Sequence, residues 1–132
     1  MQLYLVRHAD ATPGDPDELR PLSDEGREQA RELGERMRDD GVVPDVVLTS
    51  PLLRARETGD ALARATGATS EADERLAPGA TAETLREAIS GRGEHVVVVG
   101  HQPDCSQIAA ALTGGPEPAF PPGGMVAIDL PE

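Results

Sequence analysis

The sequence predicts an α/β fold, a three-layer α/β/α sandwich around a largely parallel central sheet. Strand-like segments alternate with helix-like segments along the chain, which is typical of βαβ units. Residues 95–101 contain four consecutive valines without polar alternation, as expected for a central strand covered on both faces. A length of 132 residues suits one hydrophobic core. We therefore expect a single domain over residues 1–132.

The chain opens with a predicted strand–helix unit. Residues 2–7 have the pattern of a short, mostly buried strand, and the Pro, Gly and Asp residues that follow predict an exposed loop. Residues 22–41 predict a helix with Ser23 as its N-cap and acidic residues in its first turn. Gly41 is expected to end it.

A second unit repeats this pattern. Residues 45–50 predict a strand, and the next segment predicts a helix that ends at Gly67. Pro51 suits the first helical position, and Ser50 is expected to cap this helix rather than to contact a ligand.

The remaining segments complete the alternation. We expect irregular chain over 68–80, a helix over 81–90 capped by Thr81, a strand over 95–101, a helix over 104–115 and a last strand, at an edge, over 125–130.

Composition excludes several classes of function. The 12 basic residues are all Arg, the acidic residues number 24, and the formal net charge is −12, so the surface should repel a nucleic-acid backbone. The single cysteine, Cys105, cannot form an internal disulfide. No apolar run approaches the length that spans a bilayer, and the first residues lack a leader pattern. We expect a cytoplasmic protein with no membrane partner.

Polar residues collect where the predicted strands end. Arg7 and His8 end the first strand, Arg54 follows the second by one helical turn, and His101 ends the valine-rich strand. In open parallel sheets, ligands bind at the carboxyl ends of the strands. Two guanidiniums there suit a phosphoryl group, and an imidazole against that group can act as a nucleophile.

At these residues the sequence resembles the histidine phosphatase superfamily. The segments VRHADA, SPLLRARET and VVGHQP match its motifs in order, and RPLSDEGREQA and GHQPDCSQIAAALTGG are similar to the SixA-like phosphohistidine phosphatase branch. The resemblance implies that His8 is the phosphorylated nucleophile and that Arg7, Arg54 and His101 form the phosphate pocket. It also implies catalysis without a metal or another cofactor.

One feature of related phosphatases and mutases is missing. They carry a general-acid Glu two residues after a Leu, whereas here the residue two positions after Leu76 is Pro78. The proton donor is therefore unassigned, and the candidates are Asp10, Asp73, Glu74, the substrate itself and water.

The substrate is predicted from two absences. Only 29 residues, 67–95, separate the second helix from the valine-rich strand, which leaves no room for a sizeable lid. An open site without a general acid favours a phosphohistidine-containing partner, such as a phosphocarrier or phosphotransfer domain. The acidic surface suggests that such a partner docks through a basic face.

Three alternative functions stay open. A broad-specificity phosphomonoesterase would use the same site. A metal-dependent hydrolase could take ligands from H-x-D at 8–10 and H-x-x-D at 101–104, although two guanidiniums would repel its cation. A non-catalytic phosphohistidine-binding or phosphate-binding module would keep the pocket without turnover.

Four other conspicuous residues are expected to be structural. Arg56 should lie on another face of its helix from Arg54, and Arg20 is more consistent with pairing to a surface carboxylate than with the site. His95 begins its strand at the end opposite His101. Cys105 lacks the C-x-x-x-x-x-R loop of a cysteine phosphatase.

Overall fold

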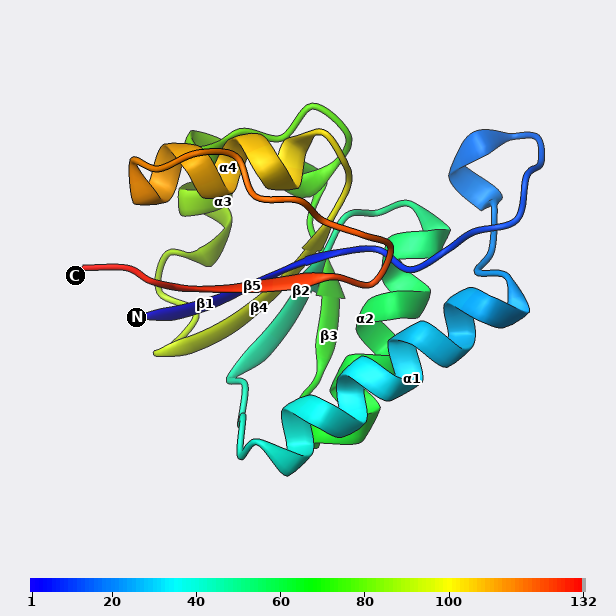
Figure 1. Ribbon diagram of the computed structural model, residues 1–132, viewed down its shortest axis with the longest axis horizontal. Coiled ribbons are helices and arrows are strands. Elements are labelled where there is room, and N and C mark those ends of the chain that lie inside the picture. The colour runs from blue at the N-terminus through cyan, green and yellow to red at the C-terminus, as the bar shows by residue number, and fades with distance from the viewer. Residues whose placement is uncertain (132) are drawn as a thin grey trace.

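The computed structural model describes residues 1–131 and has one five-stranded sheet with helices on both faces (Figure 1). The sheet order is β3-β2-β4-β1-β5. All neighbours pair in parallel except β5, an antiparallel edge strand beside β1. The strands are β1 Gln2–Arg7, β2 Val46–Thr49, β3 Ser70–Ala72, β4 His95–Gly100 and β5 Met125–Asp129. This architecture confirms the predicted α/β class.

Four α-helices form the outer layers. Helices α1 and α2 pack together on one face, and α3 and α4 lie on the other (Figure 1). Their bounds are α1 Asp24–Asp39, α2 Leu53–Thr66, α3 Ala82–Ile89 and α4 Asp104–Thr113; two short 3-10 helices, η1 Asp17–Leu19 and η2 Glu74–Leu76, lie in the loops. No large lid is present among residues 1–131, as the sequence predicts.

The central strands are buried on both faces, which explains the unbroken valine run. In β4, Val96 and Val98 belong to the core beneath α3 and α4, whereas Val97 and Val99 belong to the core beneath α1 and α2. With few aromatic residues available, aliphatic side chains supply almost all of this burial, the main favourable contribution to folding.

Most predicted helix ends are confirmed. The Ser23 hydroxyl accepts a hydrogen bond from the Gly26 backbone N–H, and Thr81 forms a reciprocal capping box with Thr84. Gly67 ends α2 in the left-handed region at φ +78°, where a side chain would be strained.

Two local predictions are wrong. Residues 68–80 contain a strand and a 3-10 helix, because the polar segment 70–72 joins the sheet through backbone pairing with β2 and has no hydrophobic pattern of its own. Helix α2 begins at Leu53, after Pro51, and its N-cap residue Leu52 makes no side-chain capping bond.

Candidate active site

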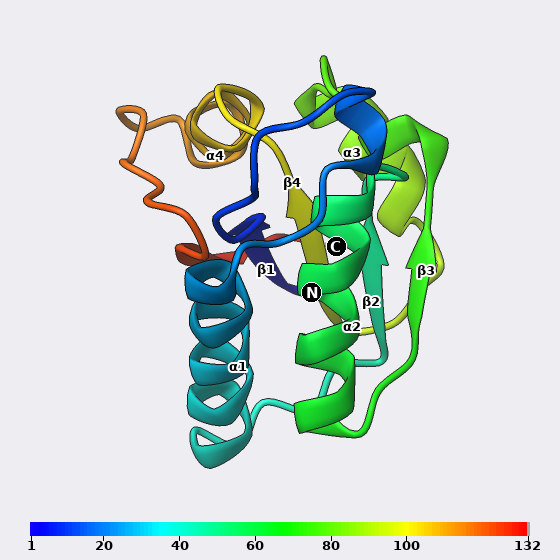
Figure 2. The same cartoon turned by 90° about the vertical axis from the view of Figure 1, so that its right-hand side faces the viewer.

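Strand register brings the two predicted histidines together. Arg7 of β1 lies opposite Gly100 of β4, so His8 and His101 follow at the same carboxyl edge of the sheet. Their rings meet edge to face with centroids 5.1 Å apart. Figure 2 looks onto this edge, where β1, β4 and the start of α2 converge. Parallel pairing thus places residues 93 positions apart in contact.

The His8 ring is oriented by its own backbone. Its Nδ1 lies 2.7 Å from the carbonyl oxygen of Ala9, and because a carbonyl only accepts, Nδ1 carries the proton. The lone pair is therefore on Nε2. Burial lowers the His8 pKa below its usual value, and the positive charges of Arg54 and Arg7 lower it further, against the opposing effect of the Ala9 carbonyl. The ring is neutral at pH 7.

His101 is held by a hydroxyl. Its Nε2 lies 2.7 Å from Oγ of Ser50, and the same oxygen accepts a hydrogen bond from the backbone N–H of Leu52. Burial, followed by the charges of His8 and Arg54, lowers the His101 pKa to about 4. The expectation that Ser50 caps α2 is therefore wrong: its hydroxyl orients the second histidine instead.

Arg7 is poised to bind an anion. Its Nη1 donates to the backbone oxygen of Phe120 at 2.9 Å, which fixes the guanidinium against the segment before β5. Its Nε is buried and lacks a hydrogen-bond partner, the single such side-chain atom found in residues 1–131. A buried N–H without an acceptor is costly, and a phosphoryl oxygen would satisfy it.

Arg54 is buried at the start of α2 and linked to the nucleophile segment through one threonine. The Thr58 hydroxyl donates to the Arg54 carbonyl oxygen at 2.8 Å and accepts from the Ala9 N–H at 3.1 Å. Thr58 closes the S-x-x-x-R-A-x-x-T segment of the sequence. This relay fixes the residue after His8 relative to the helix that carries Arg54.

Asp17 is a site residue that the sequence analysis missed. Its backbone oxygen accepts from Arg54 Nη1 at 2.9 Å, and its carboxylate lies between Arg54 and Arg20. Arg20 pairs with this carboxylate as expected, yet its charge also contributes to lowering the His8 pKa. The available signal was an Asp in the loop after the nucleophile strand, but a contact across 37 positions leaves no local pattern.

The candidate proton donors are engaged elsewhere. The Asp10 carboxylate accepts from the Ser23 hydroxyl at 2.6 Å, at the start of α1. Asp73 pairs with Arg75, which holds its pKa below the usual value, and Glu74 is exposed on η2. The structure shows no bond from these three carboxylates to His8, Arg7, Arg54 or His101. Asp10 is thus better explained as part of a helix start than as a proton donor.

The other conspicuous residues lie outside the cluster. Arg56 is exposed and donates to the Pro51 carbonyl, and His95 is exposed at the opposite edge of the sheet. Burial raises the pKa of the Cys105 thiol to about 12, so it is protonated and unreactive at pH 7.

Together these residues define a class of site. Two guanidiniums provide donors for phosphoryl oxygens, and one neutral imidazole presents a lone pair beside them. Helix α4 begins three residues after His101 and adds the positive end of its dipole. No three His, Cys, Asp or Glu side chains within residues 1–131 are grouped to hold a metal ion. The arrangement contains the groups that a phosphoryl-transfer site with a histidine nucleophile requires.

The chain belongs to the histidine phosphatase superfamily (branch 1), whose family model matches residues 3–78. An uncharacterized protein of Picosynechococcus is 36% identical over 123 residues, covering 87% of this chain and 74% of that protein. A mitochondrial serine/threonine-protein phosphatase, Pgam5 of Drosophila willistoni, is 41% identical over 59 residues, and this match covers only 20% of its length and 44% of this chain.

Solved structures agree with this membership. The protein histidine phosphatase SixA complexed with tungstate has a TM-score of 0.89 at 25% identity, covering 98% of this chain and 88% of that one. A SixA structure from Agrobacterium tumefaciens has a TM-score of 0.84 at 28% identity, covering 98% and 90%. Family and fold support a phosphatase of the SixA-like branch. No helix within residues 1–131 is long and apolar enough to cross a membrane.

Proposed function

We propose that this protein is a metal-independent phosphatase that forms a phosphohistidine on His8 and removes phosphoryl groups from phosphohistidine in a signalling or phosphotransfer protein. The observation that carries the proposal is the Nδ1–H bond from His8 to the Ala9 carbonyl. It fixes the tautomer whose free Nε2 can attack phosphorus, while the lowered pKa keeps the ring neutral.

In the first step, Nε2 of His8 attacks phosphorus and the bond to the leaving group breaks. Arg7 and Arg54 hold the phosphoryl oxygens. His101, with its Nε2 accepting from the Ser50 hydroxyl, donates from Nδ1 to an oxygen on which charge accumulates. The new phosphoimidazole ring of His8 keeps its proton on Nδ1, so the ring is cationic and itself a good leaving group.

In the second step, water attacks phosphorus of phospho-His8. The P–Nε2 bond breaks, its electron pair returns to Nε2, and His8 leaves as the neutral imidazole from which it started. The water protons remain with the product as dihydrogen phosphate, so this step needs no protein acid.

The same chemistry favours phosphohistidine as the substrate. A substrate imidazole protonated on its distal nitrogen departs as a neutral ring, whereas an alkyl phosphate must leave as an alkoxide unless an acid protonates it. The candidate donors Asp10, Asp73 and Glu74 make no bond to the site. Similarity to the protein histidine phosphatase SixA supports the same choice.

The test uses a phosphohistidine-bearing phosphocarrier protein and, separately, p-nitrophenyl phosphate, with EDTA present. We expect fast phosphate release from the protein, slow release from the ester, and neither with His8→Ala. Quenching in alkali should trap an acid-labile phosphoryl group on His8. The matched control is His95→Ala, which removes an exposed histidine at the other end of the strand and should leave both rates unchanged.

Each contrary outcome selects another function. Faster ester hydrolysis would make the protein a broad-specificity phosphomonoesterase. Loss of activity in EDTA would identify a metal-dependent hydrolase, and near-normal activity of His8→Ala would refute the nucleophile. Tight phosphate binding without release would indicate a binding module.

A further inference from the structure

Asp17 lies across the guanidinium that the phosphoryl group must use. Its Oδ2 accepts from Arg54 Nη2 at 3.2 Å, and its Oδ1 accepts from Arg20 Nη1 at 2.9 Å. The Arg54 side chain is 9% exposed, whereas the Asp17 carboxylate is 61% exposed. A solvent-facing carboxylate therefore covers a buried cation of the phosphate pocket.

Substrate binding changes this contact. Asp17 Oδ2 accepts from one N–H of Arg54 Nη2, so a phosphoryl oxygen that takes the same N–H displaces one carboxylate oxygen. The residue itself stays in place, because its backbone oxygen is bound to Nη1 and its other carboxylate oxygen to Arg20. Both cations also lower the Asp17 pKa, so the displaced group remains an anion.

The loop places this anion at the entrance of the site. Residues 11–21 project beyond the carboxyl edge of the sheet (Figure 1), and η1 is the part that returns against α2 (Figure 2). The negative charge on Asp17 also acts to raise the pKa of His101, so the electric field of Asp17 reaches the pocket. A substrate ring that leaves on the side of the pocket facing η1 would therefore lie beside the Asp17 carboxylate.

We propose that Asp17 is a specificity-determining residue that accepts a hydrogen bond from the distal N–H of a protonated phosphoimidazole. This inference rests on the proposed phosphohistidine substrate. When Nε2 of His8 attacks, the substrate P–N bond breaks and its electron pair goes to the leaving nitrogen. The distal proton stays on the ring, which leaves as neutral imidazole, so atoms and charges balance. The carboxylate favours the protonated, more reactive form of the substrate.

The same anion disfavours other phosphates. An aryl phosphate offers no N–H to Asp17, and its phenolate leaving group gains negative charge as the bond breaks. Its phosphoryl group also competes with the carboxylate for the Arg54 guanidinium. Asp17 therefore raises selectivity for phosphoimidazole over an aryl ester by assisting one reaction and opposing the other.

The test compares kcat/KM of Asp17→Asn and wild type on phosphoimidazole and p-nitrophenyl phosphate. We expect the ratio of the two values to fall on the order of tenfold or more, as for loss of a charge-assisted hydrogen bond. As the pH is raised, the activity on phosphoimidazole should begin to fall at a lower pH in the variant than in wild type. The reason is that the variant stabilises the protonated substrate ring less. Inorganic phosphate should inhibit the variant at a lower concentration than wild type, because the asparagine of the variant would compete with phosphate for Arg54 less strongly than the Asp17 carboxylate does.

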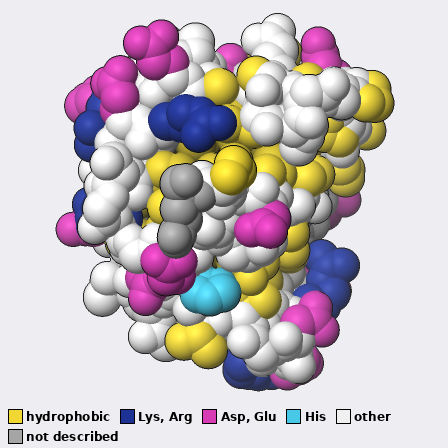
Figure 3. All heavy atoms as spheres, turned by 90° about the vertical axis from the view of Figure 1, so that its left-hand side faces the viewer, with side chains coloured by type: hydrophobic (Ala, Val, Ile, Leu, Met, Phe, Trp, Pro, Cys, Tyr) yellow, Lys and Arg dark blue, Asp and Glu magenta, His cyan; other side chains and the backbone are white. Residues whose placement is uncertain are grey.

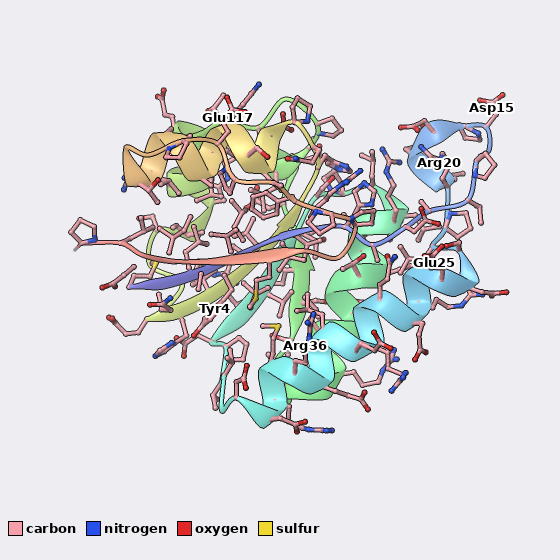
Figure 4. The ribbon with its side chains drawn as sticks, in the orientation of Figure 1. Tyr4, Asp15, Arg20, Glu25, Arg36 and Glu117 are labelled. Atoms are coloured by element: carbon pink, nitrogen blue, oxygen red, sulfur yellow. The ribbon has the colours of Figure 1, made fainter. Side chains whose placement is uncertain are left out.

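The matched control is Asp15→Asn. Asp15 lies on the same loop at its outer tip, whereas Arg20 lies nearer the body of the protein (Figure 4). This control removes the same charge without touching Arg54 and should leave the ratio unchanged. An unchanged ratio in Asp17→Asn, or an equal fall on both substrates, would overturn the proposal for Asp17. Wild type that prefers the aryl ester or ignores phosphoimidazole would instead refute the phosphohistidine function itself.

Discussion

At the scale of single residues, the two histidines of the site illustrate how position decides role. His8 is oriented by a backbone carbonyl that can only accept, which leaves Nε2 with its lone pair. His101 is held by the Ser50 hydroxyl and lies deeper, at 5% exposure. Burial lowers both pKa values, so neither ring adds a cation to a pocket that already holds two guanidiniums.

The lowered pKa of His101 predicts an acid-labile fold. Between pH 6.5 and about 4 the unfolded chain binds a proton at this residue that the folded chain does not. The free energy of unfolding should therefore fall by up to ~1.4 kcal/mol for each pH unit as pH decreases through this window. Denaturant unfolding of wild type and His101→Gln at several pH values in this window gives the free energy of unfolding as a function of pH. The difference between the two slopes measures the contribution of His101. Parallel curves would contradict it.

The two pocket arginines predict a graded loss of activity. Arg7→Ala or Arg54→Ala should lower kcat/KM on the order of a hundredfold or more, because each removes donors that stabilise charge on the phosphoryl oxygens. Arg56→Ala is the matched control, since Arg56 is exposed on the same helix as Arg54. Steady-state kinetics with circular dichroism separates lost chemistry from lost folding. Equal effects at positions 54 and 56 would refute the assignment.

At the scale of elements, local patterns predicted what each segment forms but not every contact between segments. The strand over 95–101 was predictable because burial on both faces demands apolar side chains throughout. The strand over 70–72 was not, because its three residues have no hydrophobic pattern and join the sheet through backbone pairing with β2. Ser50 was assigned to a cap because a serine before Pro51 is typical of a helix start.

The site shows the same division. The convergence of Arg7, His8, Arg54 and His101 was predictable because each lies at the end of a recognisable strand or about one helical turn beyond it. Asp17 was not, since it lies in a loop and its contact with Arg54 exists only once η1 has folded onto α2. Residues that act through tertiary contacts leave no periodic signal in the sequence.

Helix α1 makes a close approach that can be tested at Gly26. A Cβ built there would lie 1.9 Å from the Asp10 carbonyl oxygen, so Gly26→Ala must push the helix from the segment that follows His8. We expect a loss of about 1–3 kcal/mol in the free energy of unfolding, as for other overpacked sites. Gly14→Ala is the control, because its Cβ would meet Arg20 Cγ at an ordinary 3.6 Å. Equal stability of the two variants would show that α1 shifts freely.

At the scale of the whole molecule, positive charge at the active site contrasts with a net negative charge on the chain. The active site concentrates positive charge from Arg7 and Arg54, whereas the chain as a whole carries a formal charge of −12. The space-filling view of the end opposite the site shows acidic and basic side chains scattered between apolar ones (Figure 3). Many arginines are tied to nearby carboxylates at the surface, as in the pairs Arg27–Asp24, Arg31–Glu28 and Arg92–Glu71.

This excess of negative charge predicts that salt stabilises the fold. Exposed ion pairs contribute little each, whereas repulsion among the unpaired carboxylates acts over the whole surface. Raising KCl from about 0.01 to 1 M shortens the screening length from about 30 to 3 Å. We therefore expect Tm at pH 7 to rise by a few degrees, which corresponds to about 1 kcal/mol.

A second pH gives the control for this salt effect. Near the isoelectric point the ionised carboxylates are balanced by the cationic Arg and His side chains, so the net repulsion is absent and the same addition of KCl should hardly change Tm. Thermal unfolding at both pH values, each in low and high salt, measures the difference directly. A Tm that falls with salt at pH 7 would mean that the local arginine–carboxylate pairs outweigh the net repulsion, and that the acidic composition does not destabilise this chain at low salt.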